Sequence, residues 1–327
     1  METKRPTNPA AEEILGGYFP VLDHGFVSLV DYMGSDASIE QAARVSYGAG
    51  TRKVSQTRGL VRYLRRHHHT TPSEMVELKF HCAMPMFVAR QWIRHRTASV
   101  NEYSGRYSLM PLLFYTPREG NFARQNESNR QGRAGASAPE ALYREAVSRW
   151  EATRKKASED YGWLVEEDVA RELARIDLPL STYTQWYWKI DLHNLFHFLT
   201  LRAAPNAQWE IQEYARVMAG MLERVAPLSY EAWVDYNFGA EPFSRGEVEA
   251  ISRLLEPSEK GIRVREGAKE LGGEDLEGLG LSPREVRELK EKLRPAPRPD
   301  FELDLTRMRA AEDVERDMYE AVPTAFD

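Results

Sequence analysis

The sequence predicts a fold that mixes α-helices with β-strands and ends in a helical extension. A strand is indicated at residues 76–83, where apolar and polar residues alternate strictly. A helix is indicated at 207–225, where apolar residues recur every three or four positions. After Gly239 the sequence becomes more strongly acidic, and the helix-start signals there precede short, polar segments. A chain of 327 residues, 42% of them hydrophobic and 29% charged, is long enough for about two soluble domains.

The N-terminal region is predicted to begin with a loose arm over residues 1–21. A short strand follows at 25–34. A capping-box signature that begins at Ser38 predicts a helix through about Tyr47. Helical spacing then continues through 54–66.

The next region combines a helix-start signal, a strand and a helix. Residues 71–74 read Thr-Pro-Ser-Glu, a second capping-box signature with proline at the first helical position. The strand at 76–83 places Cys82 on its apolar face, which predicts a buried and inert thiol. Pro85 then opens a helix through about residue 96.

A glycine-rich polar stretch at 121–138 predicts a loop. Apolar spacing predicts four further helices after this loop, at 139–160, 163–175, 184–201 and 207–225.

The C-terminal segment 240–327 is charged and is expected to form a helical extension of unknown role. It contains 22 acidic and 15 basic residues, a net charge of −7, whereas the whole chain carries −6. Capping-box signatures at Ser244 and Ser282 predict short helices near 245–255 and 283–293.

Composition excludes several classes of protein. Cys82 is the single cysteine, so one chain can form neither an internal disulfide nor a cysteine-ligated cluster. No apolar run is long enough to span a membrane, and no secretory signal is recognisable. We therefore expect a cytoplasmic protein without a membrane partner. The Rossmann and P-loop glycine motifs and the serine-hydrolase elbow are all missing from the sequence.

The densest group of polar residues lies at 90–108, where a helix end runs into a loop of hydroxyl and amide side chains. Arginine makes permanently charged, bidentate contacts to phosphate, and Gly105 allows the backbone to approach an anion closely. The alternative is a solvated basic surface paired with carboxylates. The ordered string of donors favours an anion site.

A second polar group is spread over the later helices and comprises Arg175, Asp191, His193, His197 and Arg202. His193 and His197 are four residues apart, a spacing that could present two imidazoles to a metal ion. The glutamate that zinc proteases place after the first histidine is missing. The favoured interpretation is therefore a core histidine whose hydrogen bonds are made within the protein, and no metal site is predicted. Thr71 and Glu74 have an equally good structural explanation as reciprocal helix caps.

Residues 94–107 read RHRTASVNEYSGRY and match the pattern RHRxxSxNxxSxRY. In this the chain resembles the flavin-dependent thymidylate synthases. The resemblance extends over about 22–237 and includes five further stretches: GFVSLVDYMG, AARVSY, the T-P-x-E at 71–74, FVARQWIRHR and LRAAPNAQWEIQEYA. It implies a catalytic domain over 22–239, which leaves out the arm and the extension.

The resemblance implies an α+β subunit with an antiparallel sheet flanked by helices. It further implies a homotetramer whose active sites are shared between subunits, and no nucleic-acid partner. The implied reaction is the reductive methylation of dUMP to dTMP. Methylenetetrahydrofolate would supply the one-carbon unit, and FAD reduced by NADPH would carry the hydride. The family uses no cysteine nucleophile, which agrees with the expected burial of Cys82.

The resemblance also assigns roles to individual residues. Arg202 resembles the arginine set against the uracil ring, where a fixed cation favours ionisation of the ring nitrogen and activates the pyrimidine carbon. The positions that resemble flavin-binding residues are Ser46, Thr71, Arg94, His95, Arg96, Glu102, Asp191, His193 and His197. Those that resemble dUMP-binding residues are Gln91, Arg94, Glu102, Tyr103, Ser104, Gly105, Arg106, Arg175 and Arg202. Some members carry an amide where this chain has Asp191.

Two other functions compete with this interpretation. The basic segment 90–108, with Tyr103 and Tyr107 for stacking, could bind a nucleic acid or nucleotide without catalysis. The near-neutral charge of residues 1–239 and the pI near 5.9 count against it. A degenerate family member retained for assembly or flavin storage is the other alternative, and the complete signature argues against it.

Overall fold

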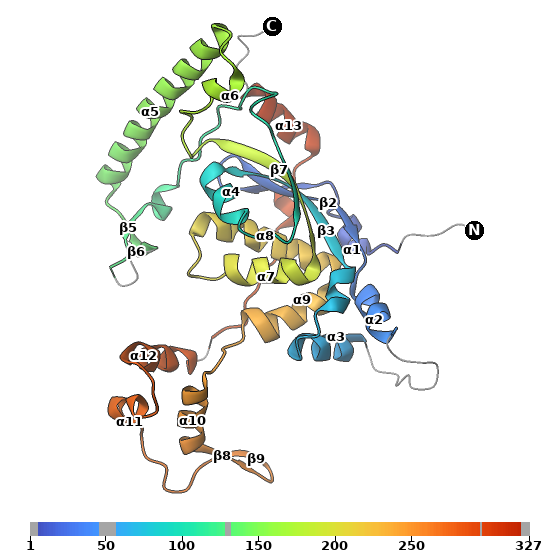
Figure 1. Ribbon diagram of the computed structural model, residues 1–327, viewed down its shortest axis with the longest axis vertical. Coiled ribbons are helices and arrows are strands. Elements are labelled where there is room, and N and C mark those ends of the chain that lie inside the picture. The colour runs from blue at the N-terminus through green and yellow to red at the C-terminus, as the bar shows by residue number, and fades with distance from the viewer. Residues whose placement is uncertain (1–5, 46–56, 128–131, 295, 322–327) are drawn as a thin grey trace, which may run out of the picture. The chain divides into compact units, whose positions relative to one another are not determined.

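The computed structural model describes residues 6–45, 57–127, 132–294 and 296–321, and the chain divides into two compact units (Figure 1). The first unit consists of Met1–Trp233 together with Asp300–Asp327, and the second of Val234–Pro299. The segment expected to form one extension over 240–327 is therefore divided between the two units.

The first unit is built on a five-stranded antiparallel sheet in the order β1-β2-β3-β7-β4. Its strands are β1 (Tyr18–Val21), β2 (Gly25–Met33), β3 (Glu77–Pro85), β7 (Tyr183–Asp191) and β4 (Ser99–Glu102). The predicted fold class, an antiparallel sheet with flanking helices, is confirmed. The predicted strands at 25–34 and 76–83 are confirmed as β2 and β3.

Strand β3 lies in the middle of the sheet and shows why the alternation in the sequence is informative. Leu78, Phe80 and Cys82 are fully buried, whereas Lys79 and His81 between them are only partly buried. Successive side chains of a strand point to opposite faces, so this pattern assigns one face of the sheet to the core.

The helix predicted over 184–201 is wrong in its first half, because Tyr183–Asp191 is strand β7. Trp186, Trp188 and Ile190 are buried, whereas Tyr187 between them is exposed. This is a two-residue period of aromatic and β-branched residues, which favours a strand. The helix begins only at Leu192, directly after the strand.

The stretch after the signature arginines was expected to be a loop, but Ser99–Glu102 forms the edge strand β4. It pairs with β7 in the register Val100 with Trp188 and Glu102 with Trp186. All four residues of β4 are exposed, so no alternation of apolar residues marks it in the sequence. The strand extends the sheet to the predicted substrate residues.

Three helices cover the buried face of the sheet (Figure 1): α4 (Met86–Trp92), α7 (Leu192–Arg202) and α8 (Trp209–Val225). The helix predicted over 207–225 is confirmed as α8, and the one after Pro85 is confirmed but ends earlier. Trp92 is fully buried, with ring centroids 5.3 Å from Trp188 and 4.9 Å from Phe198. This aromatic cluster holds α4, α7 and β7 together.

Residues 6–21 of the predicted loose arm contain regular structure, which corrects the expectation for these residues. They form the short helix α1 (Pro9–Glu12) and then β1. Ala11 and Ile14 are fully buried, and Asn8 Nδ2 donates to the carbonyl of Val225 at 3.1 Å. The arm therefore belongs to the core of the first unit.

Helices α2 (Asp36–Arg44), α3 (Thr57–Arg66) and α9 (Pro227–Trp233) pack near the end of the sheet. Helix α2 starts earlier than predicted, because Ser38 Oγ accepts the N–H of Ser35 at 3.2 Å and lies inside the first turn. The capping box predicted at 71–74 is instead a short 3₁₀ helix, η1 (Thr71–Met75), without a side-chain cap.

The polar region predicted as a loop at 121–138 contains η2 (Glu119–Asn121) and a small hairpin, β5 (Ala123–Gln125) with β6 (Arg133–Ser137). The two helices predicted after it are divided differently. A long helix, α5, spans Glu140–Glu166, and a single turn, α6, spans Arg171–Ala174.

The last described stretch of the first unit, residues 300–321, contains η4 (Leu305–Arg307) and α13 (Ala311–Glu320). Val314 of α13 packs with Tyr18, Phe26 and Ala83 on the side of the sheet opposite α8 (Figure 1). The stretch 300–321 passes close to α8 at Phe301. Gly220 of α8 leaves room for it, because a Cβ there would lie 2.6 Å from the carbonyl oxygen of Phe301.

The second unit is a small body with its own core. It contains the π-helix η3 (Val234–Phe238), α10 (Arg245–Leu254), a hairpin of β8 (Leu255–Ser258) with β9 (Gly261–Val264), α11 (Gly273–Glu277) and α12 (Pro283–Lys292). Its core is formed by Ala250, Leu276, Leu281, Val286 and Leu289. The helices predicted near 245–255 and 283–293 are confirmed as α10 and α12.

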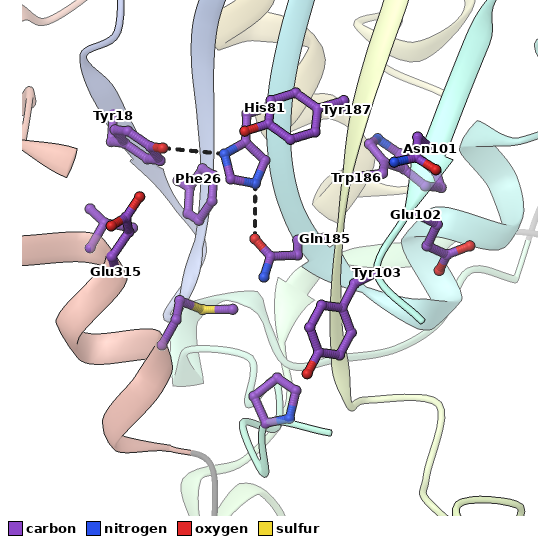
Figure 2. A pocket seen from close by; sticks show the side chains of 13 residues that line it. Tyr18, Phe26, His81, Asn101, Glu102, Tyr103, Gln185, Trp186, Tyr187 and Glu315 are labelled. Carbon is purple, nitrogen blue, oxygen red and sulfur yellow. Dashed lines mark hydrogen bonds between the residues drawn. The ribbon is translucent and has the colours of Figure 1, made fainter. Parts of the chain in front are cut away.

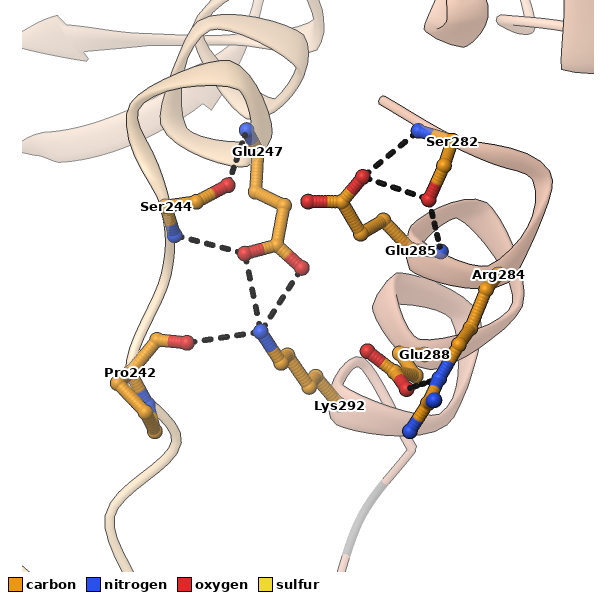
Figure 3. A network of polar contacts seen from close by, with 8 residues as sticks. All are labelled: Pro242, Ser244, Glu247, Ser282, Arg284, Glu285, Glu288 and Lys292. Carbon is orange, nitrogen blue, oxygen red and sulfur yellow. Dashed lines mark hydrogen bonds and ion pairs between the residues drawn. The ribbon is translucent and has the colours of Figure 1, made fainter. Parts of the chain in front are cut away.

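A buried ion pair joins α10 to α12 in the second unit (Figure 3). Glu247 is 2% exposed, and its carboxylate accepts from Lys292 Nζ at 2.8 and 2.9 Å and from the N–H of Ser244 at 2.7 Å. Burial alone would raise the pKa of Glu247, but the hydrogen bonds from Lys292 and Ser244 outweigh it and lower that pKa.

We expect Glu247→Gln to weaken the second unit at pH 7, because the amide leaves Lys292 without its counter-charge. The pKa of Glu247 is lowered in the folded state, so its contribution is present above the unfolded value of 4.5 and is lost as the pH falls below it. Hydrogen exchange of α10 and α12 should therefore be about tenfold faster than in wild type at pH 7, with a smaller ratio at pH 4.

Glu288→Gln is the matched control, because its partner Arg284 is 81% exposed and surface pairs contribute little. Equal exchange in the two variants at pH 7 would contradict the role assigned to Glu247.

Candidate active site

Helix α4 ends at a buried tryptophan, and polar residues flank it on both sides. Trp92 packs edge-on against Trp186 and Trp188, at centroid distances of 5.5 and 5.3 Å. Gln91 and His95 are half-buried beside it. The rigid tryptophan therefore fixes the backbone from which these polar side chains project.

Arg94 and Arg96 are exposed at the same helix end. Within the part of the chain that the structure describes, neither guanidinium has an ion pair or a hydrogen bond. An unpaired arginine keeps all five of its donors for a ligand. This pair suits a phosphate or pyrophosphate group.

Arg202, the last residue of α7, meets the end of α4. Its Nε donates to His95 Nε2 at 2.9 Å, and its Nη2 donates to the carbonyl oxygen of Gln91 at 3.3 Å. Both acceptors are neutral, so the positive charge of Arg202 is held in place without being compensated.

His95 is neutral in this arrangement. Burial lowers the pKa of His95 to about 4, and the charges of Arg202 and His197 act in the same direction. Because Arg202 can only donate, Nε2 of His95 must be the acceptor, which leaves the proton on Nδ1. The His197 ring lies 5.7 Å from the His95 ring, so a third predicted residue belongs to this group.

The edge strand β4 brings Glu102 and Tyr103 to a pocket of about 340 Å³ (Figure 2). Glu102 accepts from Thr184 Oγ1 at 2.8 Å, and the N–H of Tyr103 donates to the carbonyl of Gln185 at 2.8 Å. His81 lies in the pocket wall, bonded to Gln185 at 2.8 Å and to Tyr18 at 3.2 Å. The prediction from sequence missed His81 and Gln185, which lie on the partly exposed face of the sheet.

The turn after β4 assembles the predicted phosphate-binding residues. The carbonyl of Ser104 accepts the N–H groups of Tyr107 and Ser108, both at 3.1 Å. Gly105 is buried against Arg175, since a Cβ at Gly105 would lie 3.0 Å from Arg175 Cδ. Ser104, Gly105, Arg106 and Arg175 therefore form one group.

Arg106 differs from Arg94, Arg96 and Arg202 because its partner is a carboxylate. Its Nε lies 2.8 Å from Glu172, and both side chains are at least half exposed. Exposed pairs of this kind contribute little free energy, so an anion can displace Glu172 at small cost.

The start of α7 holds Asp191 and His193. Asp191 caps the helix and accepts from Asn194 N at 3.0 Å and from Asn194 Nδ2 at 2.7 Å. Nδ1 of His193 is buried and has no hydrogen-bond partner within the described part of the chain. A buried nitrogen without a partner is costly, so this atom is available to a ligand that reaches it.

The predicted flavin residues are thus not all adjacent within one chain. Asp191 lies at the start of α7, whereas His95 is hydrogen-bonded to Arg202 at the other end of this helix, about 16 Å further along its axis. Thr71 is exposed at the start of η1, which packs beside α7. Ser46 lies outside the described residues.

A buried carboxylate that the sequence analysis did not identify lies beside Gln91. Glu210, in the first turn of α8, is 3% exposed and is bonded to Tyr115, Arg133 and Gln208. The available signal is its position four residues before the buried Tyr214, on the apolar face of the helix. No helix in the described part of the chain is long and apolar enough to cross a membrane.

The fold and the site define an α+β protein in which permanent cations gather around half-buried polar groups, an arrangement that suits a phosphorylated ligand. The family model described as "Thymidylate synthase complementing protein" matches residues 28–228. The flavin-dependent thymidylate synthase of Gluconobacter oxydans (strain 621H) is 52% identical over 259 residues, 77% of this chain and 84% of that relative. The one from Rickettsia prowazekii (strain Madrid E) is 46% identical over 286 residues, 84% of this chain and 97% of that relative.

Among solved structures, the UMP/dUMP methylase PolB from Streptomyces cacaoi, bound with 5-Br dUMP, is similar with a TM-score of 0.61 and 32% identity. The match covers 67% of this chain and 98% of PolB. The chain therefore belongs to the flavin-dependent thymidylate synthase family and is an enzyme of the methyltransferase class.

We expect Arg202→Met to raise the pKa of His95 from about 4 towards its usual value of 6.5, because the variant removes a neighbouring positive charge. Burial of His95 remains, so the rise should be partial. Imidazole ¹⁵N chemical shifts followed from pH 3 to 8 measure it, with Arg175→Met as a control that leaves His95 untouched. An unchanged His95 titration in Arg202→Met would show that the contact is not made in solution.

Proposed function

We propose that this protein methylates dUMP to dTMP with a flavin cofactor. In detail, methylenetetrahydrofolate gives the one-carbon unit, and NADPH reduces bound FAD. Family membership and the similarity to PolB support the substrate and the flavin. The observation that carries the proposal is Arg202, a half-buried cation held by two neutral acceptors beside the signature segment.

The phosphate of dUMP would be bound by the turn after β4. Ser104 offers its hydroxyl group, Gly105 allows close approach of the backbone, and Arg106 and Arg175 supply charge. Glu102 and Tyr103, on the strand just before this turn, would lie along the nucleoside.

Arg202 is proposed to lie against the uracil ring and to stabilise negative charge on it. Its guanidinium is fixed by His95 and by the carbonyl of Gln91, so it needs no reorganisation when charge develops. Burial lowers the pKa of Arg202, and no carboxylate among the described residues neutralises it. The field of this cation would favour the ionised ring and so make the pyrimidine carbon more nucleophilic.

Two features of the chain fit a flavin. Arg94 and Arg96 offer unpaired guanidinium groups for its pyrophosphate, and His193 Nδ1 is buried without a partner among the described residues. Thr71, His95, Glu102, Asp191 and His197 are proposed as further contacts, with Ser46 outside the described residues. When bound, FAD supplies the hydride that completes the methyl group.

A cysteine nucleophile is excluded by this chain's own chemistry. Cys82 is its only cysteine, fully buried in β3, and burial raises the pKa of its thiol well above the ordinary value. The thiol is therefore protonated and inaccessible. This agrees with the proposed electrostatic activation of the pyrimidine by Arg202.

In a homotetramer with shared active sites, each end of α7 would contribute to a different complete site. Asp191 and His193 would then complete a site with Arg94 and Arg96 of another copy. The cytoplasm remains the proposed location, since the chain has ordinary soluble composition and one buried thiol.

An anaerobic visible spectrum tests the proposal. The flavin band should bleach with NADPH and return when dUMP and methylenetetrahydrofolate are added together. Arg202→Ala should still bleach with NADPH but reoxidise about 100-fold more slowly, because a preorganised charge at the uracil has been lost. Arg144→Ala, an exposed arginine of α5, is the control and should behave as wild type.

A protein that stays colourless with added FAD and binds single-stranded nucleic acid would favour the binding-module alternative instead. Wild-type reoxidation by Arg202→Ala would leave the reaction standing and refute the role of Arg202.

Gly105→Ala should weaken dUMP binding about tenfold, because the added Cβ would lie 2.6 Å from Met110 Sδ and 3.0 Å from Arg175 Cδ and would displace Arg175. Gly135→Ala is the matched control, since no atom lies within 4 Å of its added Cβ. Calorimetric titration of the flavin-loaded protein with dUMP measures both. Equal affinities would show that Arg175 does not bind the nucleotide from this position.

A further inference from the structure

Glu210 is a buried carboxylate that the proposed chemistry does not use. Its Oε1 accepts from Tyr115 Oη at 3.0 Å and from Arg133 Nη2 at 2.6 Å, and its Oε2 accepts from Gln208 Nε2 at 2.8 Å. Burying a charge costs several kcal/mol unless it is fully paired, and here three donors from three segments pair it. Such a group is fixed in both position and charge.

Arg133 forms an ion pair with Glu210 at 2.6 Å, and Tyr115 donates to the same oxygen. Arginine cannot accept a hydrogen bond. Burial and the charge of Glu210 raise the pKa of Tyr115 above its ordinary value, so this hydroxyl stays protonated and donates. The second oxygen of Glu210 therefore faces Gln208 as an acceptor.

This requirement fixes the direction of Gln208. A primary amide donates only from nitrogen and accepts only at oxygen, so Gln208 must turn its nitrogen to Glu210. Its oxygen then points the other way, where it accepts from Nε2 of Gln91. The direction follows from the chemistry of the carboxylate.

The same logic passes to Gln91. Its nitrogen is turned to Gln208, so its oxygen points away from the network, where it has no partner among the described residues. Gln91 also stands next to Arg202, which donates to its backbone carbonyl at 3.3 Å. The proposed uracil-binding cation therefore contacts the backbone of the residue whose side-chain oxygen has no partner among the described residues.

We propose that Glu210 is a positioning residue that acts through Gln208 and makes Gln91 offer a hydrogen-bond acceptor to the nucleotide. The inference depends on the proposed function. The partner must be a donor on dUMP, which is either the N–H of the uracil ring or the hydroxyl of the deoxyribose. Arg202 and Gln91 together then present one donor and one acceptor to the substrate.

Gln208→Met interrupts the relay at an exposed residue and leaves the contacts of Glu210 with Tyr115 and Arg133 in place. Glu210→Gln replaces the carboxylate with an amide that can both donate and accept, so Gln208 is no longer obliged to turn its nitrogen towards residue 210. Tyr115→Phe is the matched control, because it removes a hydrogen bond from the same carboxylate but not the bond that points to Gln91. Thermal melting and flavin absorbance of each variant report whether folding and flavin binding survive.

The probes are dUMP, dCMP, which lacks the ring N–H, and 2′,3′-dideoxyuridine monophosphate, which lacks the sugar hydroxyl. Dissociation constants are measured on flavin-loaded protein. In Gln208→Met and Glu210→Gln, dUMP should bind about tenfold more weakly. In wild type, each analogue carries a penalty, which is the ratio of its dissociation constant to that of dUMP. In both variants this penalty should fall by the same factor for one of the two analogues. In Tyr115→Phe that penalty should stay as in wild type.

The analogue whose penalty shrinks identifies the donor that Gln91 meets. If both penalties are unchanged in both relay variants while wild type binds dUMP, the inference is overturned and the proposed function stands. If wild type itself does not bind dUMP, the proposed function fails.

Discussion

The packing of Trp92 is the constraint on which the site depends. This fully buried ring contacts Trp186 and Trp188 of β7 and Phe198 of α7, all with centroids within 5.5 Å. The polar residues lie immediately beside these aromatic rings in sequence: Gln91 next to Trp92, and His197 next to Phe198. Because close-packed aromatic rings cannot shift without opening a void, the backbones that carry the polar groups are held together before any ligand binds.

The second organising feature is where the structure places counter-charges. Arg133 is paired with the buried Glu210, and Arg106 with the exposed Glu172. Arg202, in contrast, is held by an imidazole and a backbone carbonyl, and Arg94 and Arg96 have no partner among the described residues. A cation held by neutral acceptors keeps its field, whereas a cation beside a carboxylate loses most of it. Arg94 and Arg96 both come from the signature motif, whereas its third arginine, Arg106, is the one paired with Glu172.

The sequence predicts the parts of this arrangement that have a strong local pattern. Alternation identifies β3, and spacing identifies α8, because one face of each element is buried. Strand β7 was missed because its period of two runs directly into the helix that begins at Leu192. Strand β4 was missed because all four of its residues are exposed at a sheet edge. Residues 6–21 lack a local pattern because their structure depends on contacts with distant residues such as Val225.

Glu210 shows a deeper limit of sequence reasoning. A glutamate in the first turn of a helix has a sufficient local explanation, because a negative charge is favourable there. Its orienting effect depends on Tyr115 and Arg133, which lie 95 and 77 residues away in the chain. No periodicity or motif links them, whereas their chemistry as obligate donors becomes decisive once the fold has brought them together. Local sequence therefore identifies which residues are candidates for a site, and long-range packing determines which atom each of them presents.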